Sequence, residues 1–179
     1  LPQGSATAGK LPYKLLIEEK ARDIAEYCGF SQGMCYSFES PKVFDKLLLD
    51  ADDPLRDAIV ISNPLGEDFS VMRTISLNGM LTSLSTNFNR RNKDVRLYEL
   101  GNVYRPHALP LTELPDERMQ LTFGMYGEGD FYTMKGAVEE FVEEVGMKKA
   151  LQYDPKAGKN YLHPGRQANI IYNDTVIGH

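Results

Sequence analysis

Two arginines and one glutamate have the residue types and the spacing that phosphate chemistry requires. Arg73 follows a turn that begins at Asn63, and Arg105 ends a long stretch that also carries Glu99. Guanidinium groups form charge-assisted, bidentate hydrogen bonds with phosphates, and an acid is needed near the adenine or the metal. The stretch 63–105 therefore predicts two cations and a carboxylate on adjacent parts of a sheet, as an ATP-handling fold would need.

A second set of charges forms the only dense basic cluster in the chain. Arg90, Arg91 and Lys93 lie close together, and Arg96 follows them. Such a cluster can neutralise the phosphates of a tRNA, and phosphate neutralisation supplies much of the affinity in nucleic-acid binding. Cations are also favoured at the C-terminal end of a helix. The cluster is interrupted by uncharged and acidic residues and contains no aromatic residue that could stack on a base. RNA contact and a charged helix end both stay open as interpretations.

Other kinds of catalytic site lack the necessary residues. His107, His163 and His179 are far apart in the sequence, and no Cys/His spacing matches a zinc site. Cys35 falls in the middle of an expected strand, where a buried structural thiol is the simpler interpretation. We therefore predict no metal site and no nucleophilic triad, and we expect Cys28 and Cys35 to stay reduced in a cytoplasmic protein.

Composition and chain ends set the outer limits. The 179 residues are 42% hydrophobic and 25% charged, which is ordinary for one globular domain. The net charge of −5 supplies no general field that would attract nucleic acid. No apolar run approaches the length of a membrane span. Because the chain starts at Leu1 and stops at His179 inside an expected strand, we expect a piece of a longer polypeptide. Residues 1–11 have the composition of a linker, and residues 12–179 form one domain that is truncated at its C-terminal end.

Hydrophobic periodicity predicts three main helices and several strands. Pro12 opens the first helix and Gly29 stops it. A second helix carries Leu77 and Phe88 on one face, and a third begins at Asp130 and is closed by Gly146. A short helix is expected over 43–48, and strands are expected over 34–38, 58–62, 95–104, 119–125, 151–154, 168–172 and 175–177. Since several strands adjoin each other through loops and turns, we predict an α+β fold with a mainly antiparallel sheet flanked by helices.

Seven ordered segments resemble a known family, the β subunit of bacterial phenylalanine–tRNA ligase, and within it the class II synthetase-like core domain. They cover nearly the whole chain in the family's order. The segments are Gly29-Phe30 leading to Tyr36-Ser37-Phe38, Asn63-Pro64-Leu65 with Val71-Met72-Arg73-Thr74, Asn87 with Asn89-Arg90, Val95 to Gly101, Leu114 to Arg118, Met134-Lys135-Gly136, and His163-Pro164-Gly165-Arg166 with Ala168.

The resemblance implies a class II aminoacyl-tRNA synthetase-like core and a role in protein biosynthesis. In this family an α2β2 heterotetramer charges tRNA with phenylalanine, using ATP and magnesium, and the α subunit performs the chemistry. The β core lost catalysis and serves as a surface for its partner. The resemblance therefore implies an aminoacyl-tRNA synthetase, a ligase, in which this piece is inactive by itself, needs no cofactor of its own and supports the α subunit and the assembly.

The family also assigns meaning to the three residues that could bind phosphate. Active class II members carry Arg-x-Glu where this chain has Arg105-Pro106-His107. The resemblance therefore implies that Arg73, Glu99 and Arg105 are vestiges of an ATP site, with no catalytic residue among them. Arg105 is expected to pair with an acid on the sheet, and Glu99 to face solvent or pair across strands with an arginine. Two alternatives remain: an active adenylate-forming domain that uses these residues, and a tRNA-binding module that uses Arg90, Arg91 and Lys93.

The first helix and the strand after it correspond to the class II motif that builds subunit interfaces. An obligate interface of this kind typically buries more than about 2,000 Å² and resembles a divided core. The isolated piece is therefore expected to self-associate or to expose an apolar patch. The candidate interface residues are Ile17, Ala21, Ile24, Cys28, Tyr36 and Phe38.

Overall fold

A long antiparallel hairpin forms the centre of the fold. The computed structural model describes residue 4, residues 8–147 and residues 150–179, so part of the expected linker 1–11 lies outside the described residues. Strands β4 (Val95–Arg105) and β5 (Asp116–Tyr126) pair along their whole length, from Val95 opposite Tyr126 to Arg105 opposite Asp116. A short strand, β1 (Ser31–Gln32), pairs in parallel with the other edge of β4. Strand β4 of this sheet carries Glu99 and Arg105, two of the three residues that the sequence singled out for phosphate chemistry.

Two smaller sheets lie on either side of this centre. Strands β2 (Phe38–Glu39) and β3 (Val71–Met72) form an antiparallel pair. Strands β6 (Gln152–Asp154), β7 (Asn169–Tyr172) and β8 (Thr175–Gly178) form an antiparallel sheet. Only the β1–β4 pair is parallel among the described strands, so the mainly antiparallel α+β fold is confirmed.

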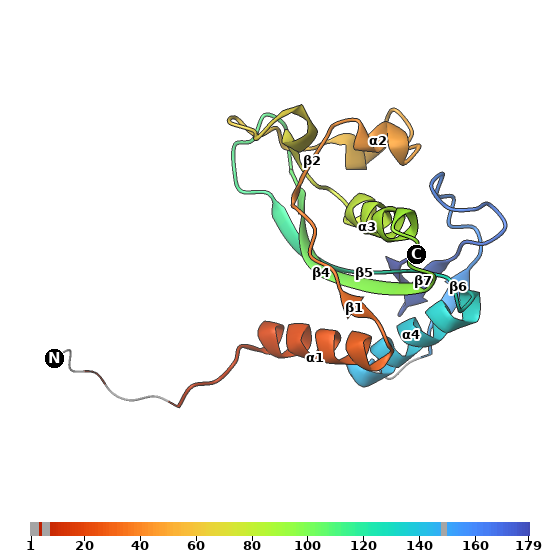
Figure 1. Cartoon of the computed structure of the whole chain (residues 1–179). Helices are drawn as coiled ribbons and strands as arrows, with labels where there is room; N and C mark the ends of the chain where they lie inside the picture. The colour runs from red at the N-terminus through yellow and green to blue at the C-terminus, as the bar shows by residue number, and fades with distance from the viewer. Residues whose placement is uncertain (1–3, 5–7, 148–149) are drawn as a thin grey trace.

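Three helices cover the two faces of the central hairpin. Helix α3 (Leu77–Asn89) lies on one face, while α1 (Tyr13–Tyr27) and α4 (Phe131–Glu144) lie on the other (Figure 1). Asp130 caps α4 because its carboxylate accepts hydrogen bonds from the first turn, and Thr133 completes a capping box. After α1, Gly29 adopts a φ of 84°, the left-handed conformation that glycine tolerates best. Short helical turns are α2 (Val43–Lys46), η1 (Pro54–Arg56) and η2 (Glu67–Phe69).

The apolar core consists of two clusters on opposite sides of the hairpin. Tyr98 is fully buried between α1 and α4, with Ala25, Phe30 and Ala137 around it. The second cluster joins α2 to the segment around β3 and includes Phe44 and other apolar side chains. No helix within the described residues is both long and apolar enough to cross a membrane. The first cluster packs α1 and α4 on the β4–β5 hairpin, whereas the second contains no residue of that hairpin.

Three expected elements differ from the observed ones. The strand expected over 34–38 is limited to β2 at its end, and Met34 and Tyr36 are 90% and 71% exposed. The expected strand 58–62 is reduced to one bridge between Val60 and Val71. Leu48 does not belong to α2, since it adopts a φ of 54° and is 63% exposed. Apolar alternation indicates side-chain burial only where a neighbouring strand or layer is present, and these segments lack one along most of their length.

Candidate functional site

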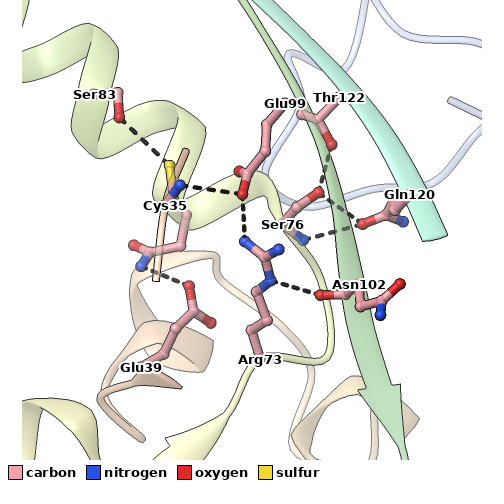
Figure 2. Close-up of polar contacts among 10 residues, drawn as sticks. Cys35, Glu39, Arg73, Ser76, Ser83, Glu99, Asn102, Gln120 and Thr122 are labelled. Carbon is pink, nitrogen blue, oxygen red and sulfur yellow. Dashed lines mark hydrogen bonds and ion pairs between the residues drawn. The ribbon is translucent and has the colours of Figure 1, made fainter. Parts of the chain in front are cut away.

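A buried ion pair joins Arg73 to Glu99 at the centre of the predicted site. Arg73 directly follows β3, and Glu99 lies in the middle of β4. The Nη1 atom of Arg73 is 2.7 Å from Oε1 of Glu99, and the two side chains are 3% and 4% exposed (Figure 2). Of the interpretations that the sequence left open for Glu99, pairing with an arginine is confirmed and exposure to solvent is wrong. The partner, Arg73, lies in the loop after β3 and not in a strand that is paired with β4.

Two further donors of Arg73, its Nε and its backbone N–H, also bind acceptors within the protein. Its Nε donates to the carbonyl of Asn102 at 2.8 Å, and its backbone N–H donates to the carbonyl of Ser37 at 2.9 Å. The backbone N–H of Tyr104 donates to the Arg73 carbonyl at 2.9 Å. A Cβ atom at Gly101 would stand 2.2 Å from Nη2 of Arg73, so only glycine leaves room for the guanidinium there. Arg73 thus connects the segment before β2 to β4, and its side chain is 3% exposed with Nε and Nη1 bound to acceptors in β4.

A second buried carboxylate, Glu39, lies near this pair. Burial raises the pKa of Glu39, and the hydrogen bond from Asn78 Nδ2 to its Oε1 at 2.9 Å opposes that shift in part, as does the charge of Arg73. Within the described residues, Oε2 of Glu39 and Oε2 of Glu99 have no hydrogen-bond partner. Burial, reinforced by the negative charge of Glu99, therefore shifts Glu39 toward its protonated form.

The remaining polar groups around the pair stabilise the fold and supply no nucleophile. Cys35 donates its backbone N–H to Oε1 of Glu99 at 3.3 Å, and its Sγ lies 3.6 Å from Oγ of Ser83 (Figure 2). Burial raises the pKa of the Cys35 thiol and a hydrogen bond with Ser83 opposes the shift, so the unreactive thiol form dominates. Ser76 donates its hydroxyl to Oε1 of Gln120 at 2.8 Å.

A cleft of about 320 Å³ opens beside the ion pair. This volume lies at the lower end of the range that small-molecule sites occupy. Two charged groups on its walls pair with each other, since Glu99 accepts from Arg73, and the third, Arg22, pairs with Glu18. Its walls include Arg22, Met34, Arg73, Glu99, Gly101 and Asn102. The cleft is therefore the surface of an internally paired cluster.

Arg105 does not join the other two residues of the predicted site. It lies six residues beyond Glu99 on the same strand, a separation of about 20 Å at the rise of an extended chain. Asp116 stands opposite Arg105 in the register, but the Asp116 carboxylate pairs with Arg118. The Nε atom of Arg105 is buried and has no acceptor among the residues that the structure describes. The expected pairing of Arg105 with an acid on the sheet is therefore wrong.

The residues proposed for an interface divide into buried and exposed groups. Ala21 and Ile24 are 3% and 6% exposed and lie in the core of this chain. Ile17, Cys28 and Phe38 are partly buried, and Tyr36 is 71% exposed beside Phe69, with ring centroids 5.8 Å apart. Sequence periodicity selected the face of α1 that its own domain covers, and it missed the exposed apolar side chains. These are Tyr13, Leu15, Leu16, Tyr27 and Met34.

The basic cluster lies at the far end of α3. Arg90 is the C-cap of this helix, and Arg91 and Lys93 follow it in an exposed turn. Among the described residues, no group of three or more His, Cys, Asp or Glu side chains is arranged to hold a metal ion. The structure thus brings Arg73 and Glu99 together and leaves Arg105 and the basic cluster apart from them.

Comparisons with known proteins agree on the type of domain. The family model described as "Phenylalanyl tRNA synthetase beta chain CLM domain" matches residues 1–179. The phenylalanine–tRNA ligase beta subunit of Clostridium tetani is 41% identical over 174 residues, which cover 97% of this chain and 22% of that protein. The beta subunit of Clostridium acetobutylicum is 43% identical over 162 residues, which cover 90% of this chain and 20% of that protein. The chain thus spans about a fifth of the length of these curated relatives.

A solved structure supports the fold independently of close sequence similarity. The pyrrolysyl-tRNA synthetase of Desulfitobacterium hafniense superposes with a TM-score of 0.70 at 18% identity, over 92% of this chain and 57% of that chain. At this identity the likeness shows the fold alone. The class II synthetase-like core predicted from the sequence is confirmed.

Proposed function

The chain belongs to the phenylalanyl-tRNA synthetase beta chain CLM domain family, and we propose that it braces a catalytic α subunit without performing chemistry itself. The complete β chain, in this proposal, assembles with α as an α2β2 phenylalanine–tRNA ligase in the cytoplasm. The observation that carries the proposal is the closed Arg73–Glu99 pair. A phosphate-binding arginine must offer free donors, and Arg73 is 3% exposed with Nε and Nη1 bound to protein acceptors.

The residues present do not fit ATP and magnesium. Adenylation needs an arginine on the α-phosphate and a nearby acid. Pro106 and His107 follow Arg105, whereas active class II members place an acid there. The carboxylate of Glu99 is engaged by Arg73 and by the backbone of Cys35. We therefore assign ATP, magnesium and the charging of tRNA with phenylalanine to the assembled enzyme, and derive no catalytic step through this domain.

Exposed apolar side chains on and after α1 support a partner surface. Tyr13, Leu16 and Tyr27 share one stripe of the helix by its 3.6-residue period, and they are 77%, 44% and 84% exposed. Met34 and Tyr36 extend the apolar surface beyond the helix. Obligate subunit interfaces are more apolar than ordinary surface, and aromatic residues and methionine are enriched in them. We call these five residues the α1 face and propose that the α subunit covers it.

Coexpression of the full-length β chain with the α subunit tests the α1 face. We expect Leu16→Asp combined with Tyr27→Asp to abolish copurification of α, because two charges would be buried without partners. The matched control is Leu65→Asp combined with Leu114→Asp, which changes two loop side chains that are 80% and 86% exposed. Retention of α by the first variant, or equal loss in both, would overturn the assignment of the face. Light scattering should also show that the isolated domain self-associates through it.

Calorimetry separates this proposal from the alternative of an active adenylate-forming domain. The 179-residue chain is titrated with ATP and magnesium, and we expect no binding heat at micromolar concentrations. Binding in that range that is lost in Arg105→Met would show that a nucleotide site has been retained. That result would refute the proposal of a silent domain and would leave the copurification experiment unaffected.

A further inference from the structure

An exposed cationic turn ends helix α3 on the side of the hairpin opposite α1 (Figure 1). Arg90, Arg91 and Lys93 are all exposed, and no salt bridge involves them within the described part of the chain. The chain as a whole carries a net charge of −5, so three adjacent unpaired cations are a local exception. The end of a helix accounts for one cation in its last turn, but Arg91 and Lys93 lie beyond the helix.

Hydrogen bonds hold the backbone of this turn in a defined shape. Arg91 has a φ of 64°, and its N–H donates to the carbonyl of Phe88 at 2.9 Å. The side chain of Asn92 donates to Oδ1 of Asn87 at 2.7 Å, and the hydroxyl of Tyr126 donates to the Asn92 carbonyl at 3.0 Å. A Cβ atom at Gly127 would stand 2.5 Å from the Lys93 carbonyl, so the end of β5 packs closely under the turn. The three cations therefore project from a preorganised loop.

An exposed aromatic side chain adjoins the cations. Phe88 is 68% exposed, and its ring lies edge-on to that of Tyr126, with centroids 5.8 Å apart and an interplanar angle of 79°. This contact fixes the Phe88 ring while leaving much of its surface in solvent. Asn87, Asp94 and Arg96 line a neighbouring cleft of about 470 Å³, together with Gly29, Ser31, Val95 and Leu97. The nearest acid, Asp94, accepts a hydrogen bond from the backbone of Glu128 at 3.1 Å.

We propose that Phe88, Arg90, Arg91 and Lys93, here called the α3 turn, bind an unpaired RNA strand. The three cations would neutralise phosphates, and Phe88 would stack on one base. Single-stranded nucleic acid is bound in this way, by cations along the backbone and by aromatic rings on which bases stack. A membrane surface fits less well, because the α3 turn offers one apolar side chain and the chain is acidic overall. The α3 turn shares no residue with the α1 face, so variants of the two surfaces can be tested separately.

Fluorescence anisotropy with a short, unstructured, labelled RNA tests the charge component. Three phosphate contacts on a single strand predict a slope of log K against log salt of about −2, or about a 20-fold loss of affinity between about 50 and 200 mM salt. At about 50 mM salt, the variant Arg90→Glu, Arg91→Glu, Lys93→Glu should bind the RNA more than about 20-fold more weakly than the native chain does, because it replaces each attraction by a repulsion. The matched control is Lys10→Glu, Lys42→Glu, Lys156→Glu, which makes the same change of net charge at exposed positions elsewhere. Equal losses in the two variants would refute a specific site.

The aromatic component needs a second variant. Phe88→Leu keeps an apolar side chain but removes stacking, so affinity should fall about 5- to 150-fold with the salt slope unchanged. An RNA duplex of the same length should bind more weakly than the single strand, because its bases are not available to Phe88. Unchanged affinity in Phe88→Leu, or duplex binding as tight as the single strand, would overturn the proposal. Tighter binding to anionic lipid vesicles than to RNA would assign the surface to membranes instead. Copurification of the α subunit should stay intact in both α3-turn variants.

Discussion

Arg73 and Arg105 are two arginines at the same strand, but they differ in how many partners their side chains have within the domain. Arg73 is 3% exposed and has an ion pair, a side-chain hydrogen bond to a carbonyl and two backbone hydrogen bonds. Arg105 stands opposite Asp116, yet that acid pairs with Arg118, and the buried Nε of Arg105 finds no acceptor among the described residues. Arg73 is therefore part of the structural framework, meaning the buried contacts that hold the strands together, whereas the Nε of Arg105 makes no such contact among the described residues.

This difference indicates which parts of an ATP-binding layout also carry structure. The side chain of Arg73 holds the middle of β4 through Glu99 and Asn102, and its backbone pairs with Ser37 and Tyr104, so replacing the side chain would remove the contacts to Glu99 and Asn102. Arg105 lies at the end of β4, beside the exposed loop that starts at His107, and its side chain makes no salt bridge or hydrogen bond to another segment among the described residues. A domain that no longer binds nucleotide would still need the first arginine, but it has no structural reason to keep the second.

Removal of Arg73 is the largest perturbation that we predict. Arg73→Met leaves Glu99 buried without its cation, and breaking a buried pair in this way typically costs about 3–5 kcal/mol. The free energy of unfolding, measured by urea denaturation, should fall by that amount. The double variant Arg73→Met, Glu99→Leu should lose less than Arg73→Met alone, since it leaves no uncompensated charge. A loss below about 1 kcal/mol in Arg73→Met would mean that the pair is not part of the framework.

A smaller effect should follow from filling the space that Arg73 occupies beside Gly101. A Cβ atom at Gly101 would lie 2.2 Å from Nη2 of Arg73 and 3.1 Å from Oε1 of Glu99. Gly101→Ala should therefore displace the guanidinium and cost about 1–3 kcal/mol, as overpacking generally does. The matched control is Gly136→Ala within α4, where nothing lies within 4 Å and alanine should add up to about 1 kcal/mol. The midpoint of thermal denaturation should fall in Gly101→Ala and rise in Gly136→Ala. An unchanged midpoint in Gly101→Ala would contradict the geometry.

The sequence predicted the long elements well because each has a strong local signal. The strand expected over 95–104 is observed as β4, and the helix that begins at Asp130 is observed with its capping box. The hairpin around Asn173 and Asp174 is also present, with both residues in the left-handed conformation. The segments 34–38 and 58–62 alternate as clearly, but alternation does not reveal whether a second strand lies alongside. Strand pairing is a tertiary property, and these two segments lack it over most of their length.

The candidate site was predictable by residue type but not by partner. An arginine across the sheet was one expected partner of Glu99, whereas Arg73 reaches it from a loop 26 positions away in the sequence. For Arg105 the register supplies the expected acid, but Arg118 lies two residues from Asp116 and pairs with it. The exposed position of the Phe88 ring beside the basic cluster was not predictable, because Tyr126, which follows far later in the chain, positions that ring. Such choices among competing partners depend on side-chain placement, which no spacing rule encodes.

The burial of Glu39 also predicts a pH dependence. Burial raises the pKa of Glu39 above its ordinary value of 4.5, so the folded state binds this proton more tightly than the unfolded chain does. Stability contributed by the protonated form is present at low pH and is lost as the pH rises from about 4.5 through the folded-state pKa. The unfolding free energy of Glu39→Gln, relative to the native chain, should therefore rise across that interval and then stay constant. Glu113→Gln, at an exposed position, is the control. A difference that does not change with pH would show that folding does not raise the pKa of Glu39.

Replacement of Arg105 should have the smallest effect and most directly tests the contrast with Arg73. Arg105→Met keeps an unbranched apolar stem and removes a buried donor that lacks an acceptor among the described residues. Removal of such a group is close to neutral or stabilising, so the free energy of unfolding should change by no more than about 0.5 kcal/mol. Arg118→Met, which removes an exposed ion pair with Asp116, should cost about 0–1 kcal/mol and serves as the comparison. A loss above about 2 kcal/mol in Arg105→Met would place Arg105 in the framework beside Arg73. The two arginines would then have been retained for the same structural reason.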